Sequence, residues 1–451
     1  MLRTSVSRVR VHRDRAARTF ALPEFRRDCT RRAGLLSYSF VSSGVVRTVS
    51  PIEPPPNTPV TSILPTEPLL LMGAGPVPIP QAVAQANGFI INHLGPTMDR
   101  VIQNLKQMAA YAFQTRSPRI LGLAGPGSAA MEMAVSNTCW PGRRVLCLKS
   151  GTFSGRLGEM AEGVGASVTY VESEAGRPVS AEAVRAALAQ SRYDVVTMAH
   201  GETSCGVRLV DLPDVCRMAK EHGALTIVDA VVTLAAMPVP MDEWGIDVCL
   251  TGGQKALSSI PGVSLCAFSD AAWAAVEAHP SPRPHWCYDA VRAQRFWGEQ
   301  QYHYTAPVPG VLALHEALRL VAEETLPRRF WRHEVSSLAM QAGLEAMGLT
   351  LFAPKDVRLN SVLAITLPDG VDSARLREHM TNAYRVEISG AFGLNIVRVG
   401  QMGEQCRSHN LFKTLYALGR SFSSQGARLD VAAGMSALEQ GLTDDRDYFL
   451  D

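Results

Sequence analysis

The stretches LTIVDAV (225–231) and IDVCLTGGQKAL (246–257) decide the fold class of this chain. Each is a short, nearly continuous apolar run, and polar side chains follow where it ends: Asp229 in the first stretch and Lys255 in the second. Runs of this kind are typical of parallel strands that are covered on both faces. A carboxylate is expensive to bury beside such strands, so Asp229 is expected to have a cationic partner.

The same pattern extends from about residue 118 to 270. Five more strand-like runs are RILGLAG (119–125), RVLCLKSG (144–151), SVTYVES (167–173), YDVVTMAHG (193–201) and VSLCAFSD (263–270). Helix-like stretches such as SAAMEMAVSNT and SAEAVRAALAQS lie between them. Strands that alternate with helices of this length predict βαβ units and a mostly parallel sheet of an α/β protein.

Beyond residue 305 the pattern changes and predicts a second, smaller α/β domain. One long helical stretch (308–348) precedes the strand-like LTLFA (349–353) and SVLAITLP (361–368), and further helices and a strand follow. We therefore expect a large domain over 61–310, a small domain over 311–430 and a tail over 431–451. Packing of the first segment of the large domain with the small domain is an alternative.

The first 60 residues differ in composition from the rest of the chain. Residues 1–50 hold eleven arginines and only three acidic residues, and PIEPPPNTPV (51–60) is rich in proline. An Arg-rich, acid-poor leader is typical of a mitochondrial transit peptide, and a proline-rich segment is typical of a linker. A disordered tail without a targeting role is the alternative, in which case we expect a cytoplasmic protein.

The whole-chain composition excludes several classes of protein. The chain is 46% hydrophobic with a formal net charge of +2, a balance that favours neither nucleic acid nor a membrane surface as partner. No apolar run reaches the ~18 residues that a membrane helix needs. The nine cysteines show no CxxC spacing or metal-ligand pattern, and several lie in strand-like runs, so we expect buried free thiols and no metal site.

Ligands of parallel sheets bind outside the carboxyl ends of the strands, so the residues that follow each run are the candidates for a site. A lysine amine next to an apolar strand end is desolvated and becomes nucleophilic, as Schiff-base formation with a carbonyl requires. Asp229 could bind a pyridinium nitrogen, and Gly127 and Ser128 open a helix whose free N–H groups attract phosphate. Phe153 could stack on a flat ring. Together these residues predict a site for pyridoxal 5′-phosphate.

Each of these residues also has a simpler explanation. Lys255 could be an ordinary surface or ion-paired lysine, and Asp229 could cap a helix or bind magnesium. The Gly127–Ser128 turn could serve helix capping alone, and Phe153 could belong to the core. The combination of residues favours the cofactor site over these separate explanations.

The motifs HGETSCGV (200–207), IVDAV (227–231) and TGGQKAL (251–257) resemble those of the class V aminotransferases. The resemblance is to the alanine–glyoxylate and serine–glyoxylate aminotransferase branch, and it runs from LMGAGPVPIP (71–80) to VRVGQMG (397–403). It implies the fold of pyridoxal-phosphate-dependent transferases of type I, with a mostly parallel seven-stranded sheet in the large domain. It also implies transfer of an amino group from alanine or serine to glyoxylate.

The resemblance implies a role for each matching residue. Lys255 would carry pyridoxal phosphate as a Schiff base and then move a proton, while Asp229 would hold the ring nitrogen protonated. The other cofactor contacts would come from Gly127, Ser128 and Gln254 at the phosphate, Phe153 and Val231 at the ring faces, and Thr203 near the ring hydroxyl. Pro126 departs from the family pattern, in which this position of the phosphate turn is serine or threonine, and it offers no N–H.

Three further assignments concern the substrate and a second subunit. Arg398 matches the arginine that binds the substrate carboxylate, with an ordinary salt bridge as its alternative, and Gly75 would lie near the substrate. Tyr302 and Thr305 match residues that reach the phosphate of the partner subunit. The resemblance therefore implies a homodimer whose active sites are shared.

Other activities stay open at this stage. AMQAGLEAMGLTLF and LPDGVD also resemble pyridoxamine–pyruvate aminotransferase, and RVEISGAFG resembles ureidoglycine–glyoxylate aminotransferase, although position 302 is tyrosine where the latter group has asparagine. A nucleotide-binding dehydrogenase is disfavoured because GLAGPG lacks a proper GxGxxG, and a P-loop is absent. An inactive scaffold that binds the cofactor is the alternative from another functional class.

Overall fold

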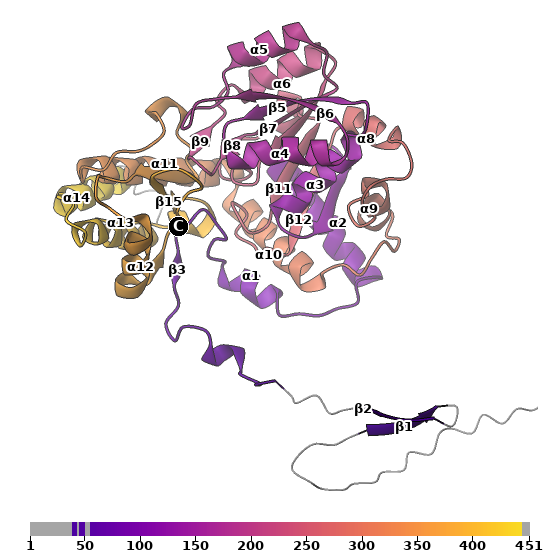
Figure 1. The fold of residues 1–451 in the computed structure, drawn as a ribbon, viewed down its shortest axis with the longest axis horizontal. Coiled ribbons are helices and arrows are strands. Elements are labelled where there is room, and N and C mark those ends of the chain that lie inside the picture. The colour runs from indigo at the N-terminus through magenta and orange to yellow at the C-terminus, as the bar shows by residue number, and fades with distance from the viewer. Residues whose placement is uncertain (1–37, 43–44, 50–54, 444–451) are drawn as a thin grey trace, which may run out of the picture. The chain divides into compact units, whose positions relative to one another are not determined.

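The computed structural model describes residues 38–42, 45–49 and 55–443, and these fall into two units, Met1–Thr66 and Glu67–Asp451. In the first unit, strands β1 (Tyr38–Ser42) and β2 (Val45–Val49) pair antiparallel, and a short 3-10 helix η1 (Val60–Ser62) follows (Figure 1). The segment that we predict to be disordered, 1–60, thus includes two strands. Most of this predicted leader lies outside the described residues.

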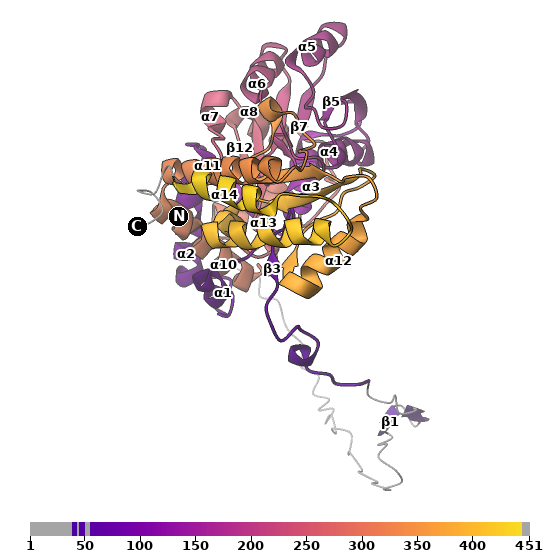
Figure 2. The same ribbon diagram turned by 90° about the vertical axis from the view of Figure 1, so that its left-hand side faces the viewer.

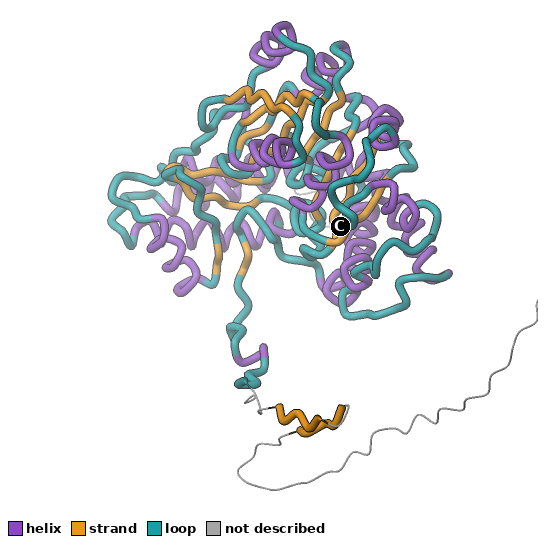
Figure 3. Tube along the Cα trace, turned by 45° about the vertical axis from the view of Figure 1, so that its right-hand side comes forward, coloured by secondary structure: helices purple, strands orange, loops and turns teal. Residues whose placement is uncertain are grey.

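The second unit is built around a seven-stranded sheet, as the strand-like runs predict. Its order is β4-β12-β11-β10-β7-β5-β6, and β12 alone runs opposite to the other strands (Figure 1). In Figure 3 the orange strands lie among purple helices. In chain order these strands are β4 (Ile120–Ala124), β5 (Arg144–Lys149), β6 (Ser167–Glu172), β7 (Val195–Ala199), β10 (Leu225–Asp229), β11 (Val248–Gly252) and β12 (Val263–Phe268). The side chains of β7, β11 and β12 are buried along their whole length, which explains why these strands read as continuous apolar runs.

Helices complete one large hydrophobic cluster with this sheet, except the first of them, whose buried Val83 packs with Ala313 and Ala317 in a separate small cluster. They are α1 (Gln81–Ala86), α2 (Pro96–Phe113), α3 (Gly127–Thr138), α4 (Thr152–Gly163), α5 (Ala181–Gln190), α6 (Leu212–Glu221), α7 (Met241–Trp244), α8 (Asp270–Glu277), α9 (Ala290–Trp297) and α10 (Val308–Glu324). Helix α3 contacts β10, β11 and β12, and α4 contacts β5, β6 and β7. The short strands β8 (Gly201–Glu202) and β9 (Val207–Arg208) form a hairpin after β7.

A second hydrophobic cluster involves the C-terminal part of the chain. Helices α11 (Leu326–Ala346), α13 (Ser408–Ser423) and α14 (Val431–Thr443) lie side by side, with α12 (Ser373–Tyr384) against α13 (Figure 2). Strands β13 (Val362–Thr366) and β15 (Ile396–Gly400) pair antiparallel, and β14 (Val386–Glu387) pairs with β3 (Leu70–Leu71). The segment around residue 70 therefore packs with the C-terminal cluster, as in the alternative arrangement, while the boundary at 310 stays a prediction.

Three details differ from the sequence-based expectation. The predicted single helix over 308–348 is broken at Thr325 (φ 67°), and α11 starts with Pro327 in its first turn, because proline has no N–H to continue α10. LTLFA contributes only one bridging residue, Leu351, opposite Ile365. The predicted tail 431–451 contains α14, whose Leu438 is wholly buried against the second cluster.

Candidate active site

Five parallel strands place their carboxyl ends at one edge of the sheet, and the residues that follow them enclose a small cavity. These strands are β4, β5, β7, β10 and β11. The cavity has a volume of about 410 Å³ and is lined by Gly127, Ser128, Met131, Phe153, Gly201, Thr203, Asp229, Val231, Val232, Gln254 and Lys255. Eight of the residues that we assign to the cofactor from the sequence thus share one cavity: Gly127, Ser128, Phe153, Thr203, Asp229, Val231, Gln254 and Lys255.

Asp229 ends strand β10 and is 7% exposed. Its Oδ1 accepts a hydrogen bond from the backbone N–H of Val231 at 2.8 Å. Burial raises the pKa of the Asp229 carboxyl to about 7, and this hydrogen bond opposes the rise. The helix-cap alternative does not hold, since the chain after β10 continues as turns rather than a helix. A carboxyl in this state is suited to a cationic ligand.

Lys255 lies in the turn after β11, and its Nζ donates a hydrogen bond to the carbonyl of Ala74. Burial lowers the pKa of the Lys255 amine to about 8; the charge of Arg398 adds to the fall, and Asp229 opposes it. Gly75 faces the lysine side chain, because a Cβ built on Gly75 would lie 2.5 Å from Lys255 Cδ and 2.7 Å from its Nζ. Gly75 therefore lies against the Lys255 side chain, and its predicted place near the substrate stays a prediction.

The start of α3 supplies a candidate anion site. Gly127 is the first residue of this helix, and a Cβ at this position would lie 2.8 Å from Val231 Cγ2, so only glycine fits without displacing Val231. Pro126 precedes the helix and contributes no N–H, which leaves the backbone N–H groups from Gly127 onward. Within the described part of the chain, the buried Oε1 of Gln254 has no hydrogen-bond partner. A buried polar atom without a partner is costly, and a ligand group in this cavity would supply one.

Phe153 stands in the first turn of α4, and a buried glutamate fixes this turn. The Glu202 carboxylate is 1% exposed and accepts hydrogen bonds from the backbone N–H groups of Phe153 (3.3 Å) and Ser154 (2.8 Å). It also accepts bonds from both the N–H and the hydroxyl of Ser204. An anion at a helix N-terminus is favoured by the helix dipole. Glu202 thereby links the aromatic ring of Phe153 to the segment that carries Thr203.

Arg398 lies in the middle of β15 and is 6% exposed. Its Nε donates to the carbonyl of Gly390 at 2.7 Å, and its Nη1 donates to the carbonyl of Thr203 at 2.8 Å. The ring of Phe392 lies 5.8 Å from the guanidinium carbon. Neutral carbonyls therefore hold Arg398 in place, and no carboxylate in the described ranges forms an ion pair with it. Such a guanidinium is suited to an incoming carboxylate.

Tyr302 and Thr305 do not line the cavity. Both are exposed, Tyr302 at 59%, and the Tyr302 ring lies 5.9 Å from the ring of His93. Their predicted contact with the phosphate of a partner subunit stays a prediction.

Other residues of the site could not be assigned from the sequence. Met131, Gly201 and Val232 line the cavity, and Glu202 fixes the turn of Phe153. The signal for Glu202 is present, since a carboxylate directly after the apolar run YDVVTMAHG must find donors when buried. Its partners on α4 are almost 50 residues away in the sequence, and nothing local identifies them.

Metal-ligand clusters and membrane-spanning helices are both absent from the described residues. No group of three or more His, Cys, Asp or Glu side chains in the described ranges could hold a metal ion. Among the same residues, no helix combines the length and the apolar character needed to cross a membrane. The eight cysteines whose state is defined are free, and all except Cys287 are buried.

Comparison with known proteins gives a consistent family. Residues 82–406, more than half of the chain, match the family described as Aminotransferase class-V. The alanine–glyoxylate aminotransferase of Oryctolagus cuniculus is 32% identical over 359 residues, which cover 77% of this chain and 91% of that protein.

Two solved structures are similar over most of the chain. The crystal structure of ureidoglycine–glyoxylate aminotransferase from Bacillus subtilis has a TM-score of 0.81 and 28% identity, covering 84% of this chain and 99% of that chain. Pyridoxamine–pyruvate aminotransferase from Mesorhizobium loti has a TM-score of 0.80 and 26% identity, covering 84% of this chain and 98% of that chain. Both structures share the predicted fold of type I. Their names are those of the two alternative activities that the sequence leaves open.

Proposed function

The chain belongs to the class V aminotransferase family, and we propose that it transfers the amino group of alanine or serine to glyoxylate through pyridoxal phosphate bound to Lys255. The observation that carries this proposal is the shared cavity of Asp229 and Lys255, whose pKa values are moved toward neutrality from opposite sides. A carboxyl and an amine in this state fit an enzyme that binds a pyridine ring and moves protons.

The residues present fit pyridoxal phosphate. Asp229 would bind the ring nitrogen, Lys255 would hold the aldehyde carbon as a Schiff base, and Val231 and Phe153 would contact the ring. Gly127, Ser128 and Gln254 would hold the phosphate, and the partnerless Gln254 Oε1 supports a ligand at this point, since its amide can rotate to donate. Thr203 would contact the ring hydroxyl.

When bound, the cofactor supplies an electron sink for the pair left behind as the substrate Cα–H bond breaks. The chain's own residues supply the proton transfer. With a pKa of about 8, the Nζ of Lys255 has a substantial neutral fraction near physiological pH, so it can accept the Cα proton and donate it again. Asp229 supports this step because its negative charge keeps a ring nitrogen protonated.

Arg398 would bind the substrate carboxylate and thereby orient the Cα–H bond. The support for this role is that carbonyl oxygens hold its side chain while its charge stays available. The bidentate fork of a guanidinium matches a carboxylate better than an ammonium does. Gly75 would leave the space that the Lys255 side chain and the substrate need.

We further propose that the active form is a homodimer. Tyr302 and Thr305 would reach the phosphate held by the partner subunit, and their exposure in a single chain is compatible with this role.

The Arg-rich composition of residues 1–50 supports import into mitochondria. Fusion of residues 1–60 to a fluorescent protein tests this proposed import, and cytosolic fluorescence would refute it.

A screen of half-reactions tests the proposed activity. Purified holoenzyme is mixed with single amino acids, and the loss of absorbance of the bound cofactor is followed; alanine and serine should react fastest, and glyoxylate should restore the spectrum most efficiently. Lys255→Ala is the control that should not react. Reaction with free pyridoxamine, together with loss of cofactor on dialysis, would favour the pyridoxamine–pyruvate activity instead. Efficient turnover of ureidoglycine would favour the third activity, and no reaction with any donor would favour a scaffold.

A further inference from the structure

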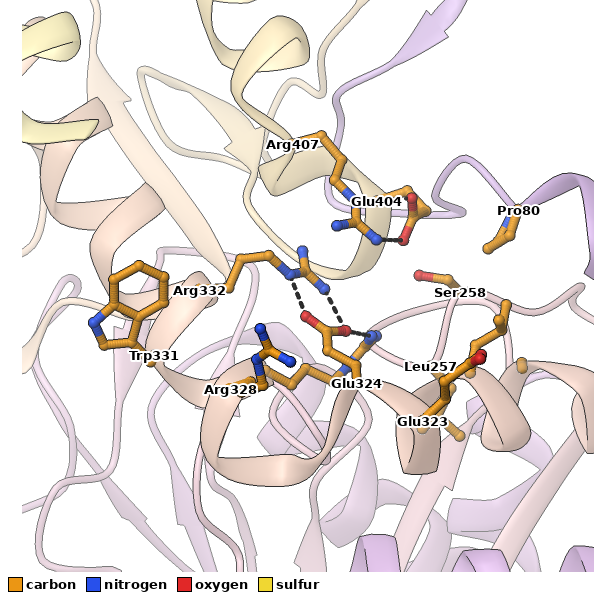
Figure 4. A pocket seen from close by; sticks show the side chains of 13 residues that line it. Pro80, Leu257, Ser258, Glu323, Glu324, Arg328, Trp331, Arg332, Glu404 and Arg407 are labelled. Carbon is orange, nitrogen blue, oxygen red and sulfur yellow. Dashed lines mark hydrogen bonds and ion pairs between the residues drawn. The ribbon is translucent and has the colours of Figure 1, made fainter. Parts of the chain in front are cut away.

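A second cavity, larger than the one that holds Asp229 and Lys255, lies behind the Lys255 turn. The space in it and at its open mouth is about 1280 Å³, and α10, α11, the 3-10 helix η3 (Gly403–Cys406) and the turn after Lys255 contribute to its wall (Figure 4). Leu257 and Ser258, which follow Lys255 closely, line it. Charged side chains dominate the rest of the lining: Glu323, Glu324, Arg328, Arg329, Arg332, Glu404 and Arg407.

Glu324, the last residue of α10, binds two buried arginines of α11. Its Oε2 accepts hydrogen bonds from Arg329 Nη1 at 2.7 Å and from Arg332 Nη2 at 2.9 Å, and its Oε1 accepts one from Arg332 Nε (Figure 4). Arg329 and Arg332 are only 3% and 5% exposed. Removing the carboxylate of such a buried cluster leaves uncompensated buried charge, which is strongly destabilising.

The other two nitrogens of Arg329 bind backbone carbonyls from two separate loops of the active site. Its Nη2 donates to the carbonyl of Ala256, the residue directly after Lys255, at 2.8 Å. Its Nε donates to the carbonyl of Ala235, in the segment that follows Asp229 and Val231, at 3.0 Å. One rigid guanidinium therefore joins the turn that carries the lysine to the loop that follows the aspartate.

The Lys255 turn has unusual features that such an anchor would stabilise. It begins with Gly253, which directly follows the end of β11 at Gly252, and Ser258 at its other end adopts a left-handed conformation with φ 57°. Among the described residues, the buried hydroxyls of Ser258 and Ser259 have no hydrogen-bond partner. Left-handed backbone at a non-glycine residue persists only where the surroundings hold it.

Arg332 provides a built-in comparison, because it shares Glu324 but binds a different segment. Its Nη1 donates to the carbonyl of Gly403 at 2.9 Å and contacts Cys406 Sγ. His333 also binds this segment, since its Nε2 accepts a hydrogen bond from the N–H of Gly403. Neither residue has a hydrogen bond to the carbonyls that Arg329 binds.

We propose that Arg329, oriented by Glu324, is a positioning residue that fixes the Lys255 turn against the loop after Asp229. This inference rests on the proposed role of Lys255 as the reacting amine. Arg329 touches neither substrate nor cofactor in this account; it acts through the backbone carbonyls of Ala256 and Ala235. A lysine at position 329 would keep the positive charge, but its single ammonium could not serve both carbonyls and Glu324 in the same geometry.

The test compares Arg329→Lys with Arg332→Lys, two identical changes in one buried cluster. In the cofactor-free full-length protein, the pH dependence of Lys255 acetylation by acetic anhydride is followed by mass spectrometry, with the exposed Lys355 as reference for reagent reactivity. The wild type should show a midpoint near a pKa of about 8. Arg329→Lys should raise this midpoint by about one unit or more, because a loosened turn lets water reach the amine. Arg332→Lys should move the midpoint clearly less, because Arg332 has no hydrogen bond to the turn itself and Gly403, which it binds, only packs against Ser258.

Kinetics of the holoenzyme supply the second measurement. Arg329→Lys should lower kcat by roughly 10- to 100-fold with little change in KM for the amino donor, since a displaced amine disturbs the chemical step more than binding. Glu324→Asp should give a smaller change in the same direction and replaces Arg329→Lys if the latter does not fold.

Equal effects of Arg329→Lys and Arg332→Lys, or an unchanged midpoint and kcat in Arg329→Lys, would refute the positioning role. A shifted midpoint in a protein that transaminates no donor would instead refute the proposed function and leave the positioning of Lys255 standing.

Discussion

The two cavities that the Lys255 turn helps to line both contain buried ionisable groups, but these groups differ in whether they have partners of opposite charge. In the larger cavity, Glu324 has arginine partners. Burial alone would raise the pKa of Glu324, but hydrogen bonds and charges from Arg332 and Arg329 hold this pKa well below its usual value. In the smaller cavity, the pKa of Asp229 rises to about 7 and that of Lys255 falls to about 8. Cavity size is thus a poor guide to the position of a catalytic site, and the groups whose pKa values are shifted toward neutrality mark the better candidate.

The comparison also separates two uses of arginine. Each of the three guanidinium nitrogens of Arg329 donates a hydrogen bond, one to a carboxylate and two to backbone carbonyls. Arg398 is bound by carbonyls through Nε and Nη1, and burial lowers its pKa while Glu202 opposes the fall. The first arginine has a carboxylate partner, which it shares with Arg332, whereas the second is held only by carbonyls and is proposed to bind the substrate carboxylate.

The largest expected effect comes from removing the amine of the smaller cavity. Lys255→Ala should lower kcat by at least about 10²- to 10⁴-fold, the range expected when a general base is removed, and should abolish the absorbance of the lysine-bound cofactor. Steady-state rates and the visible spectrum of the purified variant provide the check. A normal rate and spectrum would show that Lys255 is not the reacting amine.

Glu324→Gln should have its main effect on stability. The change leaves two buried arginines without a carboxylate and should lower the free energy of unfolding by about 3–5 kcal/mol. Glu316→Gln, on the same helix but in a more exposed pair with Arg319, is the matched control and should cost at most about 1 kcal/mol. Denaturant unfolding of both variants measures the difference, and similar values would mean that the cluster is not a structural anchor.

The same carboxylate predicts a dependence of stability on pH. Because the pKa of Glu324 is lower in the folded state than its ordinary 4.5, its contribution is present above that value and is lost as the pH falls toward the folded-state pKa. The wild type should therefore lose more stability than Glu324→Gln between neutral pH and acid. Parallel acid-unfolding curves for the two proteins would contradict this assignment.

Much of the smaller cavity could be predicted from the sequence, and little of the larger one. Asp229 ends one apolar run and Lys255 follows another within three residues of its strand, so local pattern and the rule for parallel sheets are enough to bring them together. Arg329 binds Ala235 and Ala256, which are 94 and 73 residues away, and no local pattern encodes such pairs. The break at Thr325, which places Glu324 at the end of α10, was likewise hidden in a continuous helical pattern, although Pro327 was its signal.

Arg398→Lys should have an intermediate effect, which lowers kcat/KM for the amino donor and leaves the affinity for the cofactor almost unchanged. Loss of the guanidinium fork should weaken transition-state stabilisation by about 2–3 kcal/mol, roughly 30- to 150-fold in kcat/KM for the amino donor. Affinity for pyridoxal phosphate should stay within about twofold because Arg398 does not line that cavity. A loss of cofactor affinity equal to the loss of donor affinity would assign Arg398 a structural role like that of Arg329.

The smallest expected effect concerns whether the smaller cavity is complete in one chain. Tyr302 is 59% exposed and lies outside the cavity, so in a monomer its hydroxyl has no role in cofactor binding. If the phosphate is reached from the partner subunit, Tyr302→Phe should weaken cofactor affinity by about 0.5–1.5 kcal/mol, the loss of one hydrogen bond, without changing the unfolding free energy of the cofactor-free chain. Cofactor titration monitored by fluorescence measures the first quantity. Unchanged affinity in a protein that sedimentation shows to be dimeric would mean that residues of one chain alone satisfy the phosphate, and that Gln254 and the start of α3 suffice.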